Sequence, residues 1–349
     1  MIALILAHAR SFARDLPGLV MTLALPALVY VLFAAIFGAG ARGELDLTLA
    51  IHDGAETPAS RAIAEGLVEG AARADALASA AEAERAVESG RADVGVLIAP
   101  GSPLPRIEVL AASDRALAAQ AVQAELDEAL SPAEATPSVV TVRAVGPEGD
   151  MQAVYYAGAV SVMFVFFAAM HGAMGALDDR RSGLTARLSL AAGSLPPVLG
   201  ARFTWMTTVG AAQSLVVFAI AWRALPPLEP LSIAAGLLTL VLVAAAGSGL
   251  ALAVVLWCRA RDQAQPLSTV VVLLLAALGG SMAPRFLMPE LFRDLGWLTP
   301  HAWAIEAYQA VLWRGEIDGV VQGAWLVLAG TAAAGFMIAL AAERRRRLG

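Results

Sequence analysis

Six long apolar stretches constrain the fold of this chain more than any other feature of its sequence. A membrane-spanning helix needs roughly 20 predominantly apolar residues, and each stretch is about that long. The chain is 58% hydrophobic and 15% charged, whereas a typical soluble domain is about 25% charged. We therefore expect an α-helical polytopic membrane protein with six transmembrane helices. The expected spans are 16–39, 153–176, 203–222, 231–257, 266–284 and 320–342.

The residues before the first span have a pattern of their own. Within 1–15, the side chains of Ile2, Ile5, Ala9 and Phe12 fall on one stripe of a helix, and the arginines fall elsewhere. This predicts an amphipathic helix that lies in the membrane interface, with an extension of the first span as the alternative. The first span is longer than the 7–15 apolar residues of a signal peptide, so we expect it to be retained.

The arginines predict the orientation of the spans. With the N-terminus inside, the inner segments hold twelve arginines and five acidic residues, whereas 41–150 would lie outside with eight arginines and nineteen acidic residues. Positive charge marks cytoplasmic loops. We therefore expect a multi-pass protein of the bacterial cytoplasmic (inner) membrane with both termini in the cytoplasm. Four arginines at 344–347 fit contact with anionic lipid better than a nucleic-acid site.

The segment 41–150 is soluble in composition. Its alternating apolar residues predict strands near 45–53, 92–98, 106–113 and 138–146, with helices between them. Strands that alternate with helices indicate an α/β layer structure. We expect a small inserted α/β extracytoplasmic domain. The pair His52-Asp53 at a strand end is interpreted as a turn rather than a site.

The residue inventory excludes several kinds of chemistry. The chain has no lysine, so it has no Walker A motif for binding ATP phosphates. Cys258 is its one cysteine, and the four histidines share no ligand spacing, so we expect no metal site and no cofactor. We therefore expect a protein that is not an enzyme and that hydrolyses no ATP itself.

A compact charged segment, LDDRRSGLTARLSLAAGSLPPVLGAR, follows the second span and begins at Leu177. We expect a short amphipathic helix within 177–200 that stops at Gly193, since the following prolines cannot continue it. Such a helix on the inner face can transmit force to a soluble partner. The residues alone favour the alternative of an ordinary positive-inside loop.

The segment 285–315 is too short to span a membrane and too apolar for a free loop. We expect two re-entrant or interfacial short helices, with Trp297, Trp303 and Trp313 at headgroup depth. Ionisable residues in such a place suggest an outer gate, and aromatic anchoring is the alternative. The candidate gate residues are Arg285, Pro300, His301, Trp303 and Glu306.

Nearly the whole chain resembles the permeases of the ABC-2 exporter family. The segments 14–38, 86–101 and 278–315 are similar to the family's first span, to the outer domain of its drug-exporter-like branch, and to its late Gly-Gly and Pro/Trp signature. The family usually has threonine directly after the glycine of the charged segment, whereas this chain has Leu184-Thr185. The matching residues of that segment are Asp179, Arg180, Arg181, Gly183, Arg187, Leu188, Pro196 and Arg202.

The resemblance implies a permease subunit of an ATP-driven exporter that moves a small molecule or lipid-like substrate out of the cytoplasm. It implies that 177–200 is the coupling helix that docks on separate ABC ATPase subunits. The other implied partners are a second permease copy or a homologous permease in a dimer, a periplasmic adaptor protein and membrane lipids. A membrane-anchored receptor or scaffold with a ligand-binding outer domain is one alternative. An ion-coupled secondary transporter is another, although such proteins usually show internal repeats and midplane acids.

Overall fold

The structure, a computed structural model, divides into two compact units that are described separately. Unit 1 comprises 1–34, 153–223 and 228–349, and unit 2 comprises 35–152 and 224–227. The residues described are 1–37, 48–70, 73–101, 105–112, 119, 122–123, 126, 140–145, 150–283, 285 and 288–348.

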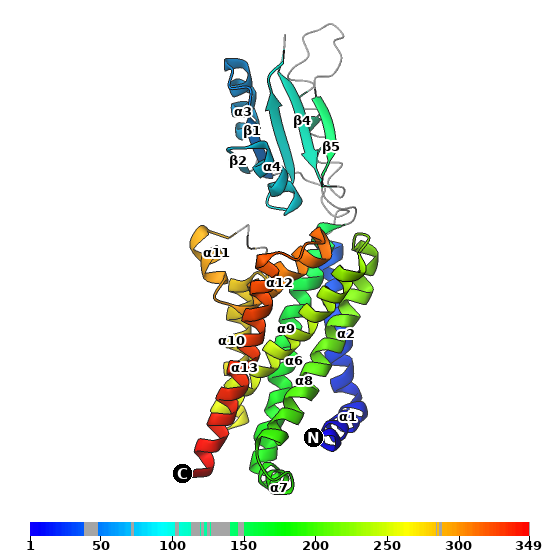
Figure 1. Ribbon diagram of the computed structural model, residues 1–349, viewed down its shortest axis with the longest axis vertical. Coiled ribbons are helices and arrows are strands. Elements are labelled where there is room, and N and C mark those ends of the chain that lie inside the picture. The colour runs from blue at the N-terminus through cyan, green and yellow to red at the C-terminus, as the bar shows by residue number, and fades with distance from the viewer. Residues whose placement is uncertain are drawn as a thin grey trace. The chain divides into compact units, whose positions relative to one another are not determined.

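Unit 1 is a bundle of helices (Figure 1). Within the described residues, five helices are long and apolar enough to cross a membrane, or up to six if the bent pair α1–α2 forms one span. The five are α6, α8, α9, α10 and α13. The helices are α1 (Ile2–Arg14), α2 (Leu16–Phe37), α6 (Met151–Arg181), α7 (Leu184–Ala191), α8 (Pro196–Ala221), α9 (Pro230–Trp257), α10 (Arg261–Gly279), α11 (Glu290–Gly296), α12 (Pro300–Gln309) and α13 (Gly319–Leu348).

Small residues allow α9 and α13 to cross at backbone contact. A Cβ added to Gly249 would overlap the backbone of Ala332, and one added to Gly335 would overlap the backbone of Gly249. Small residues let membrane helices approach closely and gain van der Waals contact. The small residues of α9 thus serve packing inside this chain.

Several helix boundaries differ from the sequence-based expectation. The second apolar helix does not stop at 176, because α6 continues through the charged residues to Arg181. The segment 177–200 is therefore the end of α6, then α7, then the start of α8 at Pro196. The helix α10 begins at Arg261 rather than at Pro266, because a proline near a helix start removes one backbone hydrogen bond without ending the helix.

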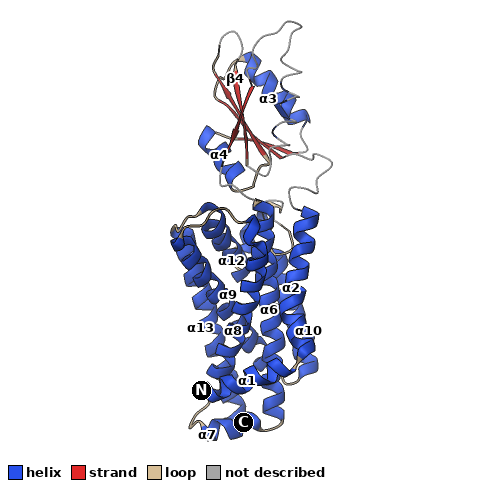
Figure 2. Cartoon of the chain, turned by 90° about the vertical axis from the view of Figure 1, so that its right-hand side faces the viewer, coloured by secondary structure: helices blue, strands red, loops and turns tan. Residues whose placement is uncertain are grey.

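Unit 2 contains a mixed sheet with helices beside it (Figure 2). The five strands of the sheet have the order β2-β1-β3-β4-β5. Strand β1 is parallel to both β2 and β3, β3 is antiparallel to β4, and β4 is parallel to β5. The strands are β1 (Thr48–Asp53), β2 (Arg73–Ala76), β3 (Val94–Ala99), β4 (Arg106–Ala111) and β5 (Val140–Ala144). The helices bounded within the described residues of unit 2 are α3 (Pro58–Gly70) and α4 (Ala80–Glu88).

The two faces of this sheet carry separate apolar cores. Alternate strand residues such as Ile51 pack with Leu67 of α3, whereas Ala50 and its neighbours pack with Val87 of α4. The alternation follows from the two-residue period of a strand. On β5, Arg143 binds Glu84 at 2.8 Å and Glu108 at 2.7 Å, and the hydrogen bond to Glu84 is the main cause that raises the pKa of Arg143.

His52 and Asp53 lie at the end of β1. The Asp53 carboxylate accepts backbone N–H bonds from Ala55 and Glu56, both at 3.1 Å, and a hydrogen bond from the Ser60 hydroxyl at 2.8 Å. Aspartate commonly stabilises a turn by bonding the backbone two residues on. These contacts give the pair the role of a turn.

Candidate functional site

Three consecutive charged residues at the end of α6 each bind a different helix. Asp178 pairs with Arg261 of α10 at 2.7 Å, and Asp179 pairs with Arg202 of α8. Arg180 lies 3.5 Å from the carboxylate of Glu343 on α13. With 3.6 residues per turn, consecutive side chains point about 100° apart, so the three reach three different neighbours. We call this arrangement the α6 brace.

The pairs of the α6 brace differ in burial. The side chain of Glu343 is 5% exposed and that of Arg180 is 18% exposed, whereas Asp178 and Arg261 are 49% and 39% exposed. Arg180 also donates to the carbonyls of Cys258 at 3.0 Å and Arg259 at 3.3 Å. These added hydrogen bonds offset part of the cost of burying a charge.

Arg202 of α8 binds α6 through both of its terminal nitrogens. One binds the carboxylate of Asp179, and the other donates to the carbonyl of Gly172 at 3.0 Å. Beside this pair lies a cavity of about 20 Å³, enough for one water molecule. Its lining includes His8, Asp179, Thr185, Leu188, Arg202 and Glu343. Residues of α1, α6, α7, α8 and α13 therefore meet at one point.

The short helix α7 follows the α6 brace directly. Gly183 has φ +70° at its N-cap, and Gly193 has φ +74° just beyond its end. Glycine adopts these left-handed conformations without the steric cost that a Cβ would impose. The two glycines therefore break the helix on either side of α7 and separate it from α6 and α8.

The buried face of α7 is polar. Thr185 and Ser189 are buried, and the Ser189 hydroxyl donates to the Thr185 carbonyl at 2.6 Å. Leu190 is 84% exposed and Arg187 is exposed as well. The α7 helix therefore buries two hydroxyl side chains and leaves Leu190 outside its packed face. Its exposed surface combines an apolar and a cationic side chain.

The coupling residues expected from the sequence differ in burial and in the contacts they make. Asp179, Arg180 and Arg202 belong to the α6 brace, and Leu188 is half-buried beside them. Arg181 is exposed. The partners Arg261 and Glu343 of the α6 brace have no signal in the sequence, because they lie on other helices.

The segment around α12 contains the expected gate residues. Thr299 caps α12 by accepting the Ala302 N–H at 3.3 Å, and Pro300 occupies the first turn. The Trp303 indole donates to the Trp297 carbonyl at 2.7 Å, and the two rings lie 4.7 Å apart. The Arg285 guanidinium lies 4.0 Å above the Trp297 ring, a cation–π geometry.

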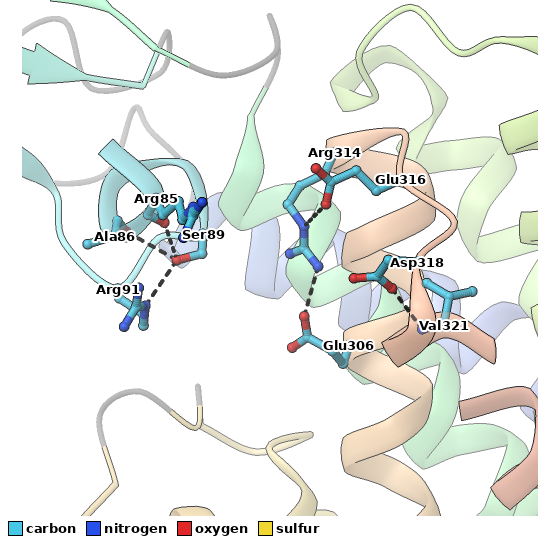
Figure 3. Close-up of polar contacts among 9 residues, drawn as sticks. All are labelled: Arg85, Ala86, Ser89, Arg91, Glu306, Arg314, Glu316, Asp318 and Val321. Carbon is cyan, nitrogen blue, oxygen red and sulfur yellow. Dashed lines mark hydrogen bonds and ion pairs between the residues drawn. The ribbon is translucent and has the colours of Figure 1, made fainter. Parts of the chain in front are cut away.

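His301 and Glu306 lie in different surroundings. His301 is fully buried and its ring lies 4.4 Å from that of Phe166. Glu306 pairs with Arg314 at 2.9 Å, and Arg314 reaches Glu316 at 3.3 Å (Figure 3). In the described part of the chain, no hydrogen bond or ion pair joins any two of the expected ionisable gate residues. They share one segment but bind other partners.

A lateral cavity of about 530 Å³ opens between α2, α6, α8 and α10. Phe164, Phe167 and Met170 contribute apolar lining, and the polar lining includes Gln213 and Ser268. The Gln213 carbonyl oxygen and the Ser268 hydroxyl are buried without hydrogen-bond partners among the described residues. The lining of the cavity thus combines apolar and polar side chains. No sequence pattern indicated it, because its residues come from four separate helices.

The fold defines a helical membrane protein with several apolar helices that could span a bilayer. The sequence profile described as "ABC-2 family transporter protein" matches residues 17–341, and the chain therefore belongs to the ABC-2 transporter family. The family resemblance expected from the sequence is confirmed. The family supplies the membrane component of ABC-type transporters, which associates with ABC ATPase subunits. No curated protein matches the chain.

Proposed function

We propose that this chain is the permease subunit of an ATP-driven exporter that moves a small molecule or lipid-like substrate out of the cytoplasm. ATP hydrolysis takes place on a separate ATPase subunit. The observation that carries the proposal is the α6 brace with α7 exposed next to it. A displacement of α7 would also displace α6, because α7 follows α6 directly. Ion pairs join α6 to α8, α10 and α13. Such a device can bias two states of the bundle from one site.

The proposed topology has six spans in the bacterial inner membrane, with α7 and both termini in the cytoplasm. The placement of the arginines supports it. The N-terminus, the C-terminus and α7 also lie at the same end of unit 1 (Figure 1). Unit 2 is then an α/β domain inserted outside the membrane, where it would meet substrate or a periplasmic adaptor protein.

The lateral cavity is the proposed substrate path. Its volume of about 530 Å³ lies in the usual range of ligand sites, about 300–1,000 Å³. A second permease copy or a homologous permease would close its open side in a dimer. The segment with Arg285, Pro300, His301, Trp303 and Glu306 would form the outer gate by moving α12.

The coupling assignment is tested with the purified permease and the ATPase subunits that copurify with it. Arg187→Glu places a negative charge on the exposed face of α7. We expect it to lower the stimulation of ATP hydrolysis about tenfold, as the loss of a charge-assisted contact would. Arg223→Glu is the matched control, because Arg223 is an exposed arginine on the link between α8 and α9.

Stimulation by Arg187→Glu at the wild-type level would show that α7 is not the coupling element. Efflux that needs no ATPase but follows a proton or sodium gradient would favour an ion-coupled transporter instead. A purified chain that binds ligand through unit 2 and moves none would favour a receptor or scaffold.

A further inference from the structure

A pocket lined by arginines lies at the end of unit 1 that carries α7 and the C-terminus. It is a pocket of about 620 Å³ between the junction of α9 with α10 and the last turns of α13. We call it the basic pocket. Its lining residues are Trp257, Arg259, Gln263, Ala342, Arg345 and Arg346. None of the residues of the α6 brace lines it.

The polar atoms of the basic pocket are mainly hydrogen-bond donors. Arg346 donates to the Trp257 carbonyl at 2.6 Å, which fixes its guanidinium at the rim. The Arg259 side chain has no hydrogen bond or ion pair within the described ranges. The Gln263 amide oxygen accepts the Arg259 backbone N–H at 3.0 Å, so its NH₂ group remains as a donor.

Carboxylates do not neutralise these cations within the described lining. Glu343, the acid nearest in sequence on α13, is buried and pairs with Arg180. Asp262 is exposed and is not part of the lining. Three arginines and one amide side chain therefore line a concave site that has no carboxylate in its lining, which fits a phosphate.

Apolar surface continues from the cations along the bundle. Trp257 is 59% exposed at the end of α9, and tryptophan is enriched where a helix leaves the membrane. Ile338 is 46% exposed and precedes Ala342 by one helical turn on α13. One face of α13 thus runs from an exposed apolar side chain to Arg345 and Arg346. A phospholipid has the same order of acyl chain and charged headgroup.

We propose that the basic pocket binds the headgroup phosphate of an anionic phospholipid, with an acyl chain along Trp257 and Ile338. Basic pockets between helices on the cytoplasmic side are suited to anionic headgroups. The proposal rests on the orientation given under the proposed function. A free phosphate would use the same arginines but would leave the apolar surface uncovered. An acidic protein surface would not need the concave shape.

The test uses the full-length permease without ATPase subunits, delipidated in a mild detergent. Lipid binding is followed by native mass spectrometry during titration with phosphatidylglycerol, phosphatidylcholine or glycerol 3-phosphate. We expect phosphatidylglycerol to bind more tightly than the other two. Arg259→Gln and Arg346→Gln should each weaken its binding about fivefold, the effect of one arginine near an anionic lipid.

Arg344→Gln is the matched control. Arg344 lies on the same part of α13, is exposed and does not line the pocket. It should change the affinity less than about twofold, since its side chain lies outside the pocket lining. Arg346→Gln also removes the bond to the Trp257 carbonyl and can disturb folding. Arg259→Gln removes no side-chain bond found in the described residues, so it keeps the test decisive.

Four results would overturn the proposal. Equal losses in all three variants would indicate a diffuse attraction of the basic end of α13. Equal binding of phosphatidylglycerol and phosphatidylcholine would remove the selectivity for an anionic lipid, and equal binding of glycerol 3-phosphate would indicate a soluble phosphate site. If only ATPase copurification responds to Arg259→Gln, the pocket binds the partner protein. Lipid binding and ATPase stimulation are separate measurements, so either proposal can fail alone.

Discussion

The two ends of unit 1 are held together in different ways. At the α7 end, the α6 brace joins helices that are far apart in the sequence through ion pairs. At the α12 end, most polar contacts stay within one segment, such as Trp303 with Trp297 and Arg314 with Glu306. The α7 end is therefore suited to move as one body.

The packing of α12 against the bundle is apolar and tight. His301 and Tyr308 are fully buried, and a Cβ on Gly158 would contact the Tyr308 ring at 3.3 Å. Steric fit should therefore matter most at the α12 end, and removal of charge should matter most at the α7 end. The following four predictions test this contrast.

The largest effect is expected for Gly279→Ala at the α12 end. The added methyl group would overlap His301 and crowd the backbone of Ala302. Overpacking of this kind costs about 3 kcal/mol of unfolding free energy. Thermal or SDS unfolding of the purified permease measures it.

Gly330→Ala on α13 is the control, because a Cβ added to Gly330 would have no neighbouring atom within 4 Å. It should stabilise the helix by up to about 1 kcal/mol. Equal effects of the two substitutions would contradict the close packing of α10 against α12.

The second-largest loss of unfolding free energy is expected for Glu343→Ala at the α7 end. It leaves one terminal nitrogen of Arg180 buried without its ionic partner, although the carbonyl contacts remain. The unfolding free energy should fall by about 2 kcal/mol. Glu316→Ala at the other end should cost less than about 0.5 kcal/mol, because Glu316 is 60% exposed and Arg314 keeps Glu306. A larger loss at Glu316 would reverse the contrast between the two ends.

The third prediction concerns the pair of Asp179 with Arg202. A double-mutant cycle with Asp179→Asn and Arg202→Gln should give an interaction energy of about 1 kcal/mol. Each single variant should also weaken ATPase stimulation, since the pair links α6 to α8 next to α7. The same cycle on Glu306 and Arg314 should change stability without changing the stimulation. Strictly additive effects at Asp179 and Arg202 would show that the pair transmits nothing.

The smallest effect is expected for Asp178→Asn. Its pair with Arg261 is exposed, so the unfolding free energy should change by less than about 0.5 kcal/mol. The difference from wild type should vanish in about 1 M salt, where the Debye length is about 3 Å. A large loss of unfolding free energy that persists in salt would indicate that Asp178 supplies most of the stability of the α6 brace.

Several elements of the fold follow from local patterns. Apolar length predicts the long helices, and glycine and proline punctuation predicts a break at Gly193. The expected third span begins at 203, whereas the helix α8 begins at Pro196. The strand β2 was not predicted, because Arg73–Ala76 contains no β-branched or aromatic residue and is held by pairing with β1. The expected helix at 115–130 lies largely outside the described residues. The end of α6 was placed too early, because a helix does not stop where its side chains become charged.

The candidate site divides in the same way. The sequence by itself determined the family, the uneven placement of arginines and the charged segment, because apolar runs, net charge and motifs are local properties of the chain. Only the tertiary structure decided that Arg180 meets Glu343, that Leu190 points outward and that Gln213 and Ser268 face one cavity. The physical reason is that helix packing sets the partner of a side chain, and packing brings together residues whose separation in the sequence carries no signal.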